Sequence, residues 1–263
     1  DRFSPSPKTS VTASTSFICE ADKETIDIEL QLKDLETVEK RLEKVTRAAK
    51  AGDKKAAKEM DLLNRVKDAL LIGVSARAVQ VADDEKELLE SFQLLTAKPV
   101  LYVCNVDEKS AKNGNAYVER VREAVKNEEA EIIVLAVATE ADITELESYE
   151  ERQMFLEDIG LDEPGASKLI RAAYHLLNLQ TYFTAGVKEV RAWTIHKGDT
   201  APQAAGVIHT DFEKGFIRAE VIAYDDFITY GSEAKVKEAG KMRVEGKEYI
   251  VKDGDIMHFR FNV

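Results

Sequence analysis

The 263-residue sequence predicts a mixed α/β fold with three structured parts: an antiparallel helical hairpin, a parallel α/β sheet and a small β-rich module. Two long stripes of apolar residues at helical spacing predict the hairpin. Two short, continuously apolar runs on either side of a helical stretch predict parallel strands that are covered on both faces. From Val190 onward the apolar residues recur with a period closer to two, which predicts half-buried strands.

The composition places the chain among acidic proteins. Asp and Glu number 49 against 37 Lys and Arg, so the formal net charge is −12. A general nucleic-acid binder needs a cationic face that releases counterions, which argues against DNA as a partner. Residues 181–263 are nearly balanced, with 12 Lys or Arg and 13 Asp or Glu. Only this part can easily carry a local basic patch.

Cysteine usage and hydropathy favour a cytoplasmic protein. Cys19 and Cys104 are far apart and form no C-x-x-C motif, so we expect reduced thiols. Cys104 lies in an apolar run, where a buried and inert thiol is expected. No apolar run approaches the length of a membrane span, and the first residues show no signal-peptide pattern.

Residues 23–96 form the predicted helical hairpin, or arm. Ile28, Leu35 and Leu42 recur every seven residues, which predicts one long amphipathic helix. Gly52 suits the end of that helix, and a second stripe of apolar residues follows it. Two such helices joined by a short turn predict an antiparallel hairpin. A third helix is expected to return the chain toward the next strand.

Residues 97–180 contain the predicted parallel sheet. Apolar runs at residues 100–104 and 132–137 predict two strands, and residues 116–126 predict the helix between them. A loop is expected at residues 138–140, after the second strand. Ligands of open α/β sheets gather at the carboxyl ends of the strands, and the loops after both strands lie there.

The loop Asn105-Val106-Asp107-Glu108 directly follows the first strand. P-loop GTPases read the nucleotide base with an Asn-Lys-x-Asp loop in this position. Its Asp accepts hydrogen bonds from the N1–H and 2-amino groups of guanine, and adenine presents neither in that arrangement. Glu108 replaces this Asp and the Lys is missing, so the loop predicts a base site that no longer requires guanine. A plain strand-end turn is the alternative, because turns favour Asn.

Residues 181–263 form the predicted C-terminal module, a small mixed sheet with one helix that is compatible with a β-grasp fold. Strands are predicted at residues 191–195, 216–221, 241–244, 249–251 and 256–261. The pairs Glu245-Gly246 and Asp253-Gly254 predict hairpin turns between the last three of these strands.

The sequence contains a base-reading motif without a recognisable phosphate-binding motif. A P-loop needs the pattern G-x-x-x-x-G-K-[ST], whose backbone and Lys cradle the phosphates. The Gly-Lys pairs at residues 240–241 and 246–247 lack both the upstream Gly and the following Ser or Thr. One Asp-x-x-Gly match, at residues 162–165, follows a predicted helix and is interpreted as chance.

Three long stretches account for this pattern by resemblance: residues 178–193, 206–221 and 253–263. Together with Leu95-Thr-Ala-Lys-Pro99 and the Asn105 loop, they resemble the YchF (Obg-like ATPase) family. The resemblance implies a partial P-loop NTPase (G-domain-like) sheet with an inserted antiparallel helical hairpin, followed by a β-grasp (TGS) domain. It also implies binding of ATP, with GTP weaker or comparable, Mg²⁺ dependence and association with the ribosome.

The resemblance assigns nucleotide binding to Asn105, Val106 and Glu108. Val106 is expected to offer backbone groups to the adenine edge, while Asn105 braces the loop. Ala138 and Thr139 are further candidates, because the second base-contacting loop of the same folds follows the next strand.

Lys214 and Arg218 are candidates for contacts with ribosomal RNA phosphates, and a solvated face is the equal alternative. The family begins with its P-loop, whereas here Phe17 runs directly into Ile18. We expect residues 1–22 to be a remnant of the G domain with segments missing. The Mg²⁺ ligands are therefore not expected in this chain, and its catalytic residues stay unassigned.

Two functions are left open. The first is a nucleoside triphosphatase, an ATPase whose hydrolysis cycle tunes its engagement with the ribosome. The second is a non-catalytic module in which the arm and the β-grasp domain bind ribosomes or proteins. An intact mass well above the 29.4 kDa of the sequence would favour the first, because it would reveal additional segments.

Overall fold

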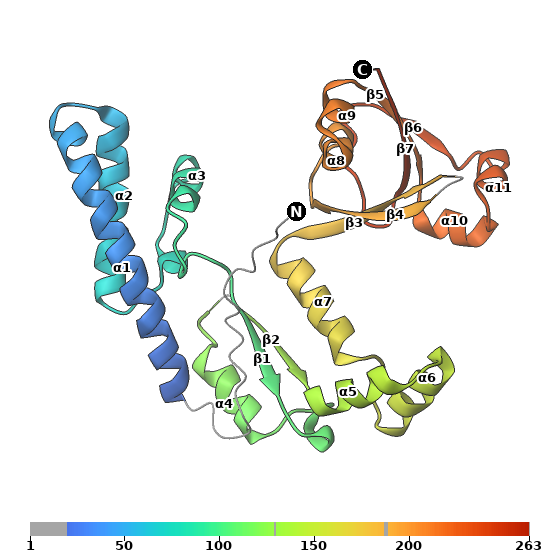
Figure 1. The fold of residues 1–263 in the computed structure, drawn as a ribbon, viewed down its shortest axis with the longest axis horizontal. Helices are drawn as coiled ribbons and strands as arrows, with labels where there is room; N and C mark the ends of the chain where they lie inside the picture. Colours follow the sequence, from blue (N-terminus) through green and yellow to red (C-terminus); the bar gives the residue numbers. More distant parts are fainter. Residues whose placement is uncertain (1–19, 129, 187–188, 263) are drawn as a thin grey trace, which may run out of the picture. The chain divides into compact units, whose positions relative to one another are not determined.

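The computed structural model describes residues 20–128, 130–186 and 189–262, and the chain divides into two compact units (Figure 1). Unit 1 comprises Asp1–Val100 and Gly114–Ala130, and unit 2 comprises Leu101–Asn113 and Glu131–Val263. Residues 1–19 of the predicted G-domain remnant lie outside the described residues. The four-part division expected from the sequence stays a prediction.

Unit 1 is built on a helical hairpin made of α1 (Glu20–Lys50) and α2 (Lys54–Leu71), as Figure 1 shows. The turn between the helices needs Gly52, whose φ of +93° lies in the left-handed region that favours glycine. Asp53 then caps α2, since its carboxylate accepts a hydrogen bond from the backbone N–H of Lys55 at 2.9 Å. The predicted hairpin and its turn are confirmed.

The apolar stripes of the two helices form the core of unit 1. The fully buried members are Val38, Leu62, Leu63 and Val66. After η1 (Ala76–Ala78) and α3 (Asp83–Ser91), Phe92 and Leu94 return the chain to this core. Ile28 lies on the predicted stripe of α1 but is 47% exposed, so the stripe is covered only over part of its length.

A buried carboxylate fastens the returning chain to α1. Asp34 is 2% exposed and accepts hydrogen bonds from the backbone N–H of Leu95 at 2.8 Å and of Thr96 at 2.7 Å. The hydroxyl of Thr96 also donates to Asp34, at 2.7 Å, and accepts from the backbone N–H of Ala76. A charged group at this depth is tolerated because these donors satisfy it.

The second segment of unit 1 contains α4 (Ala116–Ala124), which Asn115 caps through its side-chain oxygen. Ion pairs connect the residues after α4 to the hairpin. Glu128 lies 2.8 Å from the ammonium of Lys23 at the start of α1 and 3.6 Å from the guanidinium of Arg77.

Unit 2 begins with two parallel strands, β1 (Leu101–Asn105) and β2 (Glu131–Leu135), paired from Leu101 opposite Glu131 to Asn105 opposite Leu135. Three helices follow: α5 (Val137–Glu145), α6 (Tyr149–Asp158) and α7 (Gly165–Leu176). Ala172 of α7 packs against Ile133 and Leu135 of β2. Cys104 is half-buried rather than enclosed, because the described strands leave much of this small sheet uncovered.

The C-terminal part of unit 2 is a five-stranded sheet in the order β4-β3-β7-β5-β6, in which only β3 and β7 are parallel. The strands are β3 (Leu179–Ala185), β4 (Val190–His196), β5 (Phe216–Ile222), β6 (Arg243–Glu245) and β7 (Ile256–Phe261). The connecting helices are α8 (Ala201–Ile208), α9 (Thr210–Lys214), α10 (Tyr224–Tyr230) and α11 (Glu233–Glu238).

Both faces of this sheet are packed against helices. On one face Tyr182 is fully buried, and its hydroxyl donates to the carbonyl oxygen of Ala204 in α8 at 2.9 Å. The next residue of β3, Phe183, points to the opposite face and packs with Val236 of α11. The predicted mixed sheet with a helix on its face is confirmed.

The predicted hairpins at the C-terminus are wrong. The strand after Lys241 pairs with β5 and not with the segment that follows it, and residues 249–251 contribute only a bridge between Ile250 and Thr200. A polar network holds this segment as a loop: the hydroxyl of Tyr249 donates to the buried Asp255 at 2.7 Å. Burial, together with the bond to Asp255, raises the pKa of Tyr249 to about 12.

Candidate functional site: the junction of two strand ends

The site begins with Asn105, the last residue of β1. Its side-chain oxygen accepts a hydrogen bond at 3.0 Å from the backbone N–H of Val137, the first residue of α5. The first N–H groups of a helix have no partner within the helix, and Ala136 at the cap position has no side chain that could satisfy them. Asn105 therefore caps α5 from a neighbouring strand and braces the two strand ends together; its expected role in bracing the loop for nucleotide binding stays a prediction.

Val106 is held at the same junction. Its backbone N–H donates to the carbonyl oxygen of Leu135, the last residue of β2, at 3.0 Å. This N–H is therefore engaged within the protein. The backbone group that Val106 can offer to a ligand is its carbonyl oxygen, which is a hydrogen-bond acceptor.

The two acidic residues of the loop have different environments. Asp107 precedes η2 (Glu108–Ser110), and its carboxylate accepts a hydrogen bond from the backbone N–H of Ser110 at 3.0 Å. Glu108 is exposed at the first position of η2. Both carboxylates are exposed, but only that of Asp107 accepts a hydrogen bond within the turn.

The loop predicted at residues 138–140 is wrong, because these residues form the first turn of α5. The helix begins immediately after β2, where Asn105 supplies the missing cap. Ala138 is exposed, whereas Thr139 is 2% exposed, so the side chain of Thr139 cannot face a ligand. What this turn can offer is the backbone N–H of Ala138, at the positive end of the helix.

Glu140 is a residue at this junction that the sequence did not single out. Its carboxylate accepts hydrogen bonds from the backbone N–H groups of Gly165 at 2.6 Å and Ala166 at 3.0 Å. The partners are separated by about 25 residues and join two helices. No local pattern signals such a contact, since Glu at the start of a helix is common for electrostatic reasons alone.

The two candidate ribosome-binding residues lie on the C-terminal sheet. Lys214 ends α9 and Arg218 lies on β5, and both side chains are exposed. Arg218 lies opposite Arg260 of β7, and the guanidinium of Arg260 is 3.1 Å from Glu220. The hydrogen bond from Arg260 lowers the pKa of Glu220, so this carboxylate stays charged and partly offsets the cations.

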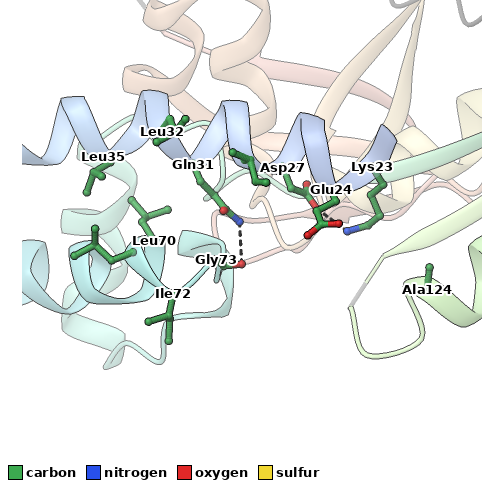
Figure 2. Close-up of a pocket in the computed structure, with 12 residues that line it drawn as sticks. Lys23, Glu24, Asp27, Gln31, Leu32, Leu35, Leu70, Ile72, Gly73 and Ala124 are labelled. Atoms are coloured by element: carbon green, nitrogen blue, oxygen red, sulfur yellow. Dashed lines mark hydrogen bonds and ion pairs between the residues drawn. The ribbon is translucent and has the colours of Figure 1, made fainter. Parts of the chain in front are cut away.

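Unit 1 contains an open cavity of about 840 Å³ beside the first half of α1 (Figure 2). Its apolar wall comes from Leu32 and Leu70, and Gln31 crosses it to donate to the carbonyl oxygen of Gly73 at 3.0 Å. Acidic and basic side chains of the first turns of α1 line its other end. None of the predicted nucleotide-binding residues lines this cavity.

The described residues contain neither a cluster of metal-binding side chains nor a helix that could cross a membrane. No group of three or more His, Cys, Asp or Glu side chains among them could hold a metal ion. A nucleotide-bound Mg²⁺ does not require such a cluster, because phosphate oxygens and waters supply most of its ligands. Likewise, none of the described helices combines the length and the apolar character that crossing a membrane requires.

Comparisons of this chain with family models, curated proteins and solved structures all find proteins named YchF. A family model named YchF-GTPase_C and described as "Protein of unknown function (DUF933)" matches residues 179–262. The "Ribosome-binding ATPase YchF" of Haemophilus ducreyi is 54% identical over 242 residues, which are 92% of this chain and 66% of that protein. The protein of the same name from Bacillus subtilis is 52% identical over 244 residues, with the same coverage.

Among solved structures, the Schizosaccharomyces pombe YchF GTPase superposes with a TM-score of 0.81 and 34% identity, covering 97% of this chain and 69% of that chain. This likeness confirms the predicted fold class, a partial G-domain-like α/β sheet followed by a β domain. The chain spans 66% of the length of the curated relatives that it matches. From these identities and this shared fold, we conclude that the chain belongs to the YchF family.

Proposed function

We propose that the chain contributes base recognition to an ATP-binding, ATP-hydrolysing protein that associates with the ribosome. The observation that carries this proposal is the hydrogen bond between Asn105 and Val137, which holds the ends of the two strands next to each other. The names of the relatives, ribosome-binding ATPases and a GTPase, support the same class of activity.

The groups at the junction favour adenine over guanine. The carbonyl oxygen of Val106 can accept a hydrogen bond from the 6-amino group of adenine, whereas guanine presents an oxygen there and the two acceptors would repel. The N–H of Ala138 can donate to a ring nitrogen. Glu108 stands where GTPases use Asp, and its longer side chain does not reproduce the pair of bonds to guanine.

We propose ATP hydrolysis only for the full-length protein of this family, and we do not propose it for this chain alone. The sequence shows no P-loop motif, and the described residues offer no cluster for Mg²⁺. The requirement for Mg²⁺ therefore stays a prediction. Because the P-loop motif is absent from the sequence, the second function stays an alternative. In it, the arm and the C-terminal sheet act as a non-catalytic ribosome-binding or protein-binding module.

Base recognition can be tested on this chain with adenosine and guanosine. The two hydrogen bonds described above, each worth about 0.5–1.5 kcal/mol, predict that adenosine binds to this chain no more tightly than in the millimolar range. Guanosine should bind more weakly than adenosine. Glu108→Asp should reduce the ratio between the two dissociation constants. Chemical-shift titration of the backbone amides measures both dissociation constants.

Glu145→Asp, an exposed change at the other end of α5, is the matched control. Tighter binding of guanosine by the unaltered chain would refute the proposal.

Ribosome association can be tested by reversing charge at Lys214 and Arg218. The double substitution to Glu should weaken co-sedimentation with ribosomes, and each lost phosphate contact should reduce the salt slope by about one unit. Substituting Glu for Lys235 and Lys237, which are exposed on α11, changes the net charge equally and is the control. Equal effects of the two double substitutions would place the contact elsewhere.

A further inference from the structure

Helix α7 begins without a cap of its own. Pro164 occupies the cap position and has no side chain that can accept a hydrogen bond from the first turn. The carboxylate of Glu140 fills this role from another helix, since it accepts the backbone N–H groups of Gly165 and Ala166, the first two residues of α7. Hydrogen bonds from N–H groups to a charged carboxylate are among the stronger ones in proteins.

The sequence at this contact is specialised for close approach. A Cβ atom on Gly165 would lie 2.8 Å from Oε1 of Glu140 and 2.8 Å from Cβ of Leu135. Both distances are shorter than a Cβ atom tolerates, so only glycine lets α7 begin this close to the end of β2. Leu135 is also the residue whose carbonyl oxygen holds the N–H of Val106. The α7 contact and the candidate base loop therefore share the same strand end.

Helix α5 depends on few anchors. Among the described residues, three hydrogen bonds at two places join it to neighbouring elements: one between Val137 and Asn105 at its start, and two between Glu140 and the N-terminus of α7 one turn later. Its buried side chains are those of Thr139 and Ile143. The two anchors flank Ala138, so they hold the helical turn that carries its N–H against β1 on one side and α7 on the other.

We propose that Glu140 is a positioning residue for the nucleotide base, which it serves by locking the first turn of α5 against α7. This inference rests on the proposed function, because it deepens the account of the same site. Glu140 is not expected to touch the base. It acts through the backbone of Ala138 and Val137, as a second anchor that complements Asn105.

The experiment uses the full 263-residue chain, isotope-labelled, with adenosine as the probe. Amide exchange is measured at Val137, Gly165 and Ala166, and adenosine affinity is measured from the shift of the Ala138 amide. In Glu140→Ala, loss of charge-assisted bonds should accelerate exchange at Gly165 and Ala166 by about tenfold or more. The inference further requires faster exchange at Val137 and adenosine affinity that is several-fold weaker.

Two further variants separate positioning from general loss of structure. Glu140→Gln keeps one acceptor oxygen, so it should restore part of the slow amide exchange at Val137 and part of the adenosine affinity that Glu140→Ala loses. Gly165→Ala leaves the carboxylate intact but pushes α7 away, and it should reproduce the changes at Val137 and Ala138. Asp142→Ala removes an exposed carboxylate from the same helix and should change neither quantity.

The outcomes are distinct. If exchange accelerates at Gly165 and Ala166 while Val137 and adenosine affinity are unchanged, Glu140 is a helix cap only and the inference is overturned. If adenosine shifts no amide of the unaltered chain, the proposed base recognition fails. The positioning role of Glu140 is then tested by amide exchange at Val137 alone. Faster exchange at Val137 in Glu140→Ala supports the role, and unchanged exchange overturns it.

Discussion

Replacing Asp34 by alanine is expected to lower the free energy of unfolding of unit 1 by about 3 kcal/mol. The substitution removes the acceptor for three hydrogen bonds, from the backbone N–H of Leu95 and from the N–H and hydroxyl of Thr96. Thr96 is itself 2% exposed, so water cannot easily replace the lost acceptor. Buried donors without partners carry their full desolvation cost.

Urea unfolding followed by far-ultraviolet circular dichroism measures this loss, because α1 and α2 are the longest described helices. Glu36→Ala is the matched control: it removes an exposed carboxylate from the same helix, 3.3 Å from Lys33. Surface ion pairs of this kind contribute about 0–1 kcal/mol, so the control should unfold close to the unaltered chain. Similar midpoints for the two variants would show that the Asp34 network does not stabilise the arm.

Replacing Gly215 by alanine is expected to destabilise the C-terminal sheet by about 3 kcal/mol, through overpacking. The added Cβ atom would lie 2.1 Å from the carbonyl oxygen of Asn262 and 3.1 Å from that of Asp211. Both neighbours are backbone, so no side chain can rotate away. The clash would also separate Gly215 from Asn262, whose N–H donates to the Gly215 carbonyl oxygen at 2.9 Å.

Trp193, the only tryptophan of the chain, lies on β4 of this sheet and reports its unfolding by fluorescence. Gly246→Ala is the control within the same module, because no atom lies within 4 Å of the added Cβ. Its midpoint in urea should match that of the unaltered chain. Equal midpoints for Gly215→Ala and Gly246→Ala would contradict the close approach seen in the structure.

Much of the fold could be predicted from the sequence because its signals are local. The apolar stripe through Leu35 and Leu42, ended by Gly52, indicates a long helix and its turn without knowledge of any partner. The continuously apolar runs before Asn105 and around Ile133 likewise indicate parallel strands. The position of the candidate base loop at the end of the first strand followed from the same periodicity.

The sequence alone could not reveal which side-chain hydrogen bonds fix the conformation of a segment. Asn105 begins α5 by capping Val137 across 32 residues, which turned a predicted loop into a helix and placed Thr139 in the interior. The strand after Lys241 pairs with β5 because Tyr249 and Asp255 hold the next segment as a loop. In both cases a side-chain hydrogen bond overrode the local preference, across 32 residues in the first case and within six residues in the second.

For this protein, the sequence by itself determined most of the element types, the family resemblance and the loop at which base recognition is proposed. The tertiary structure decided which groups of that loop are engaged within the protein and which are exposed. It engaged the N–H of Val106 with Leu135 and left Glu108 exposed, and it brought Glu140 to the start of α7. The physical reason is that periodicity records which face of an element is buried, whereas a hydrogen bond between distant residues exists only once both backbones are in place.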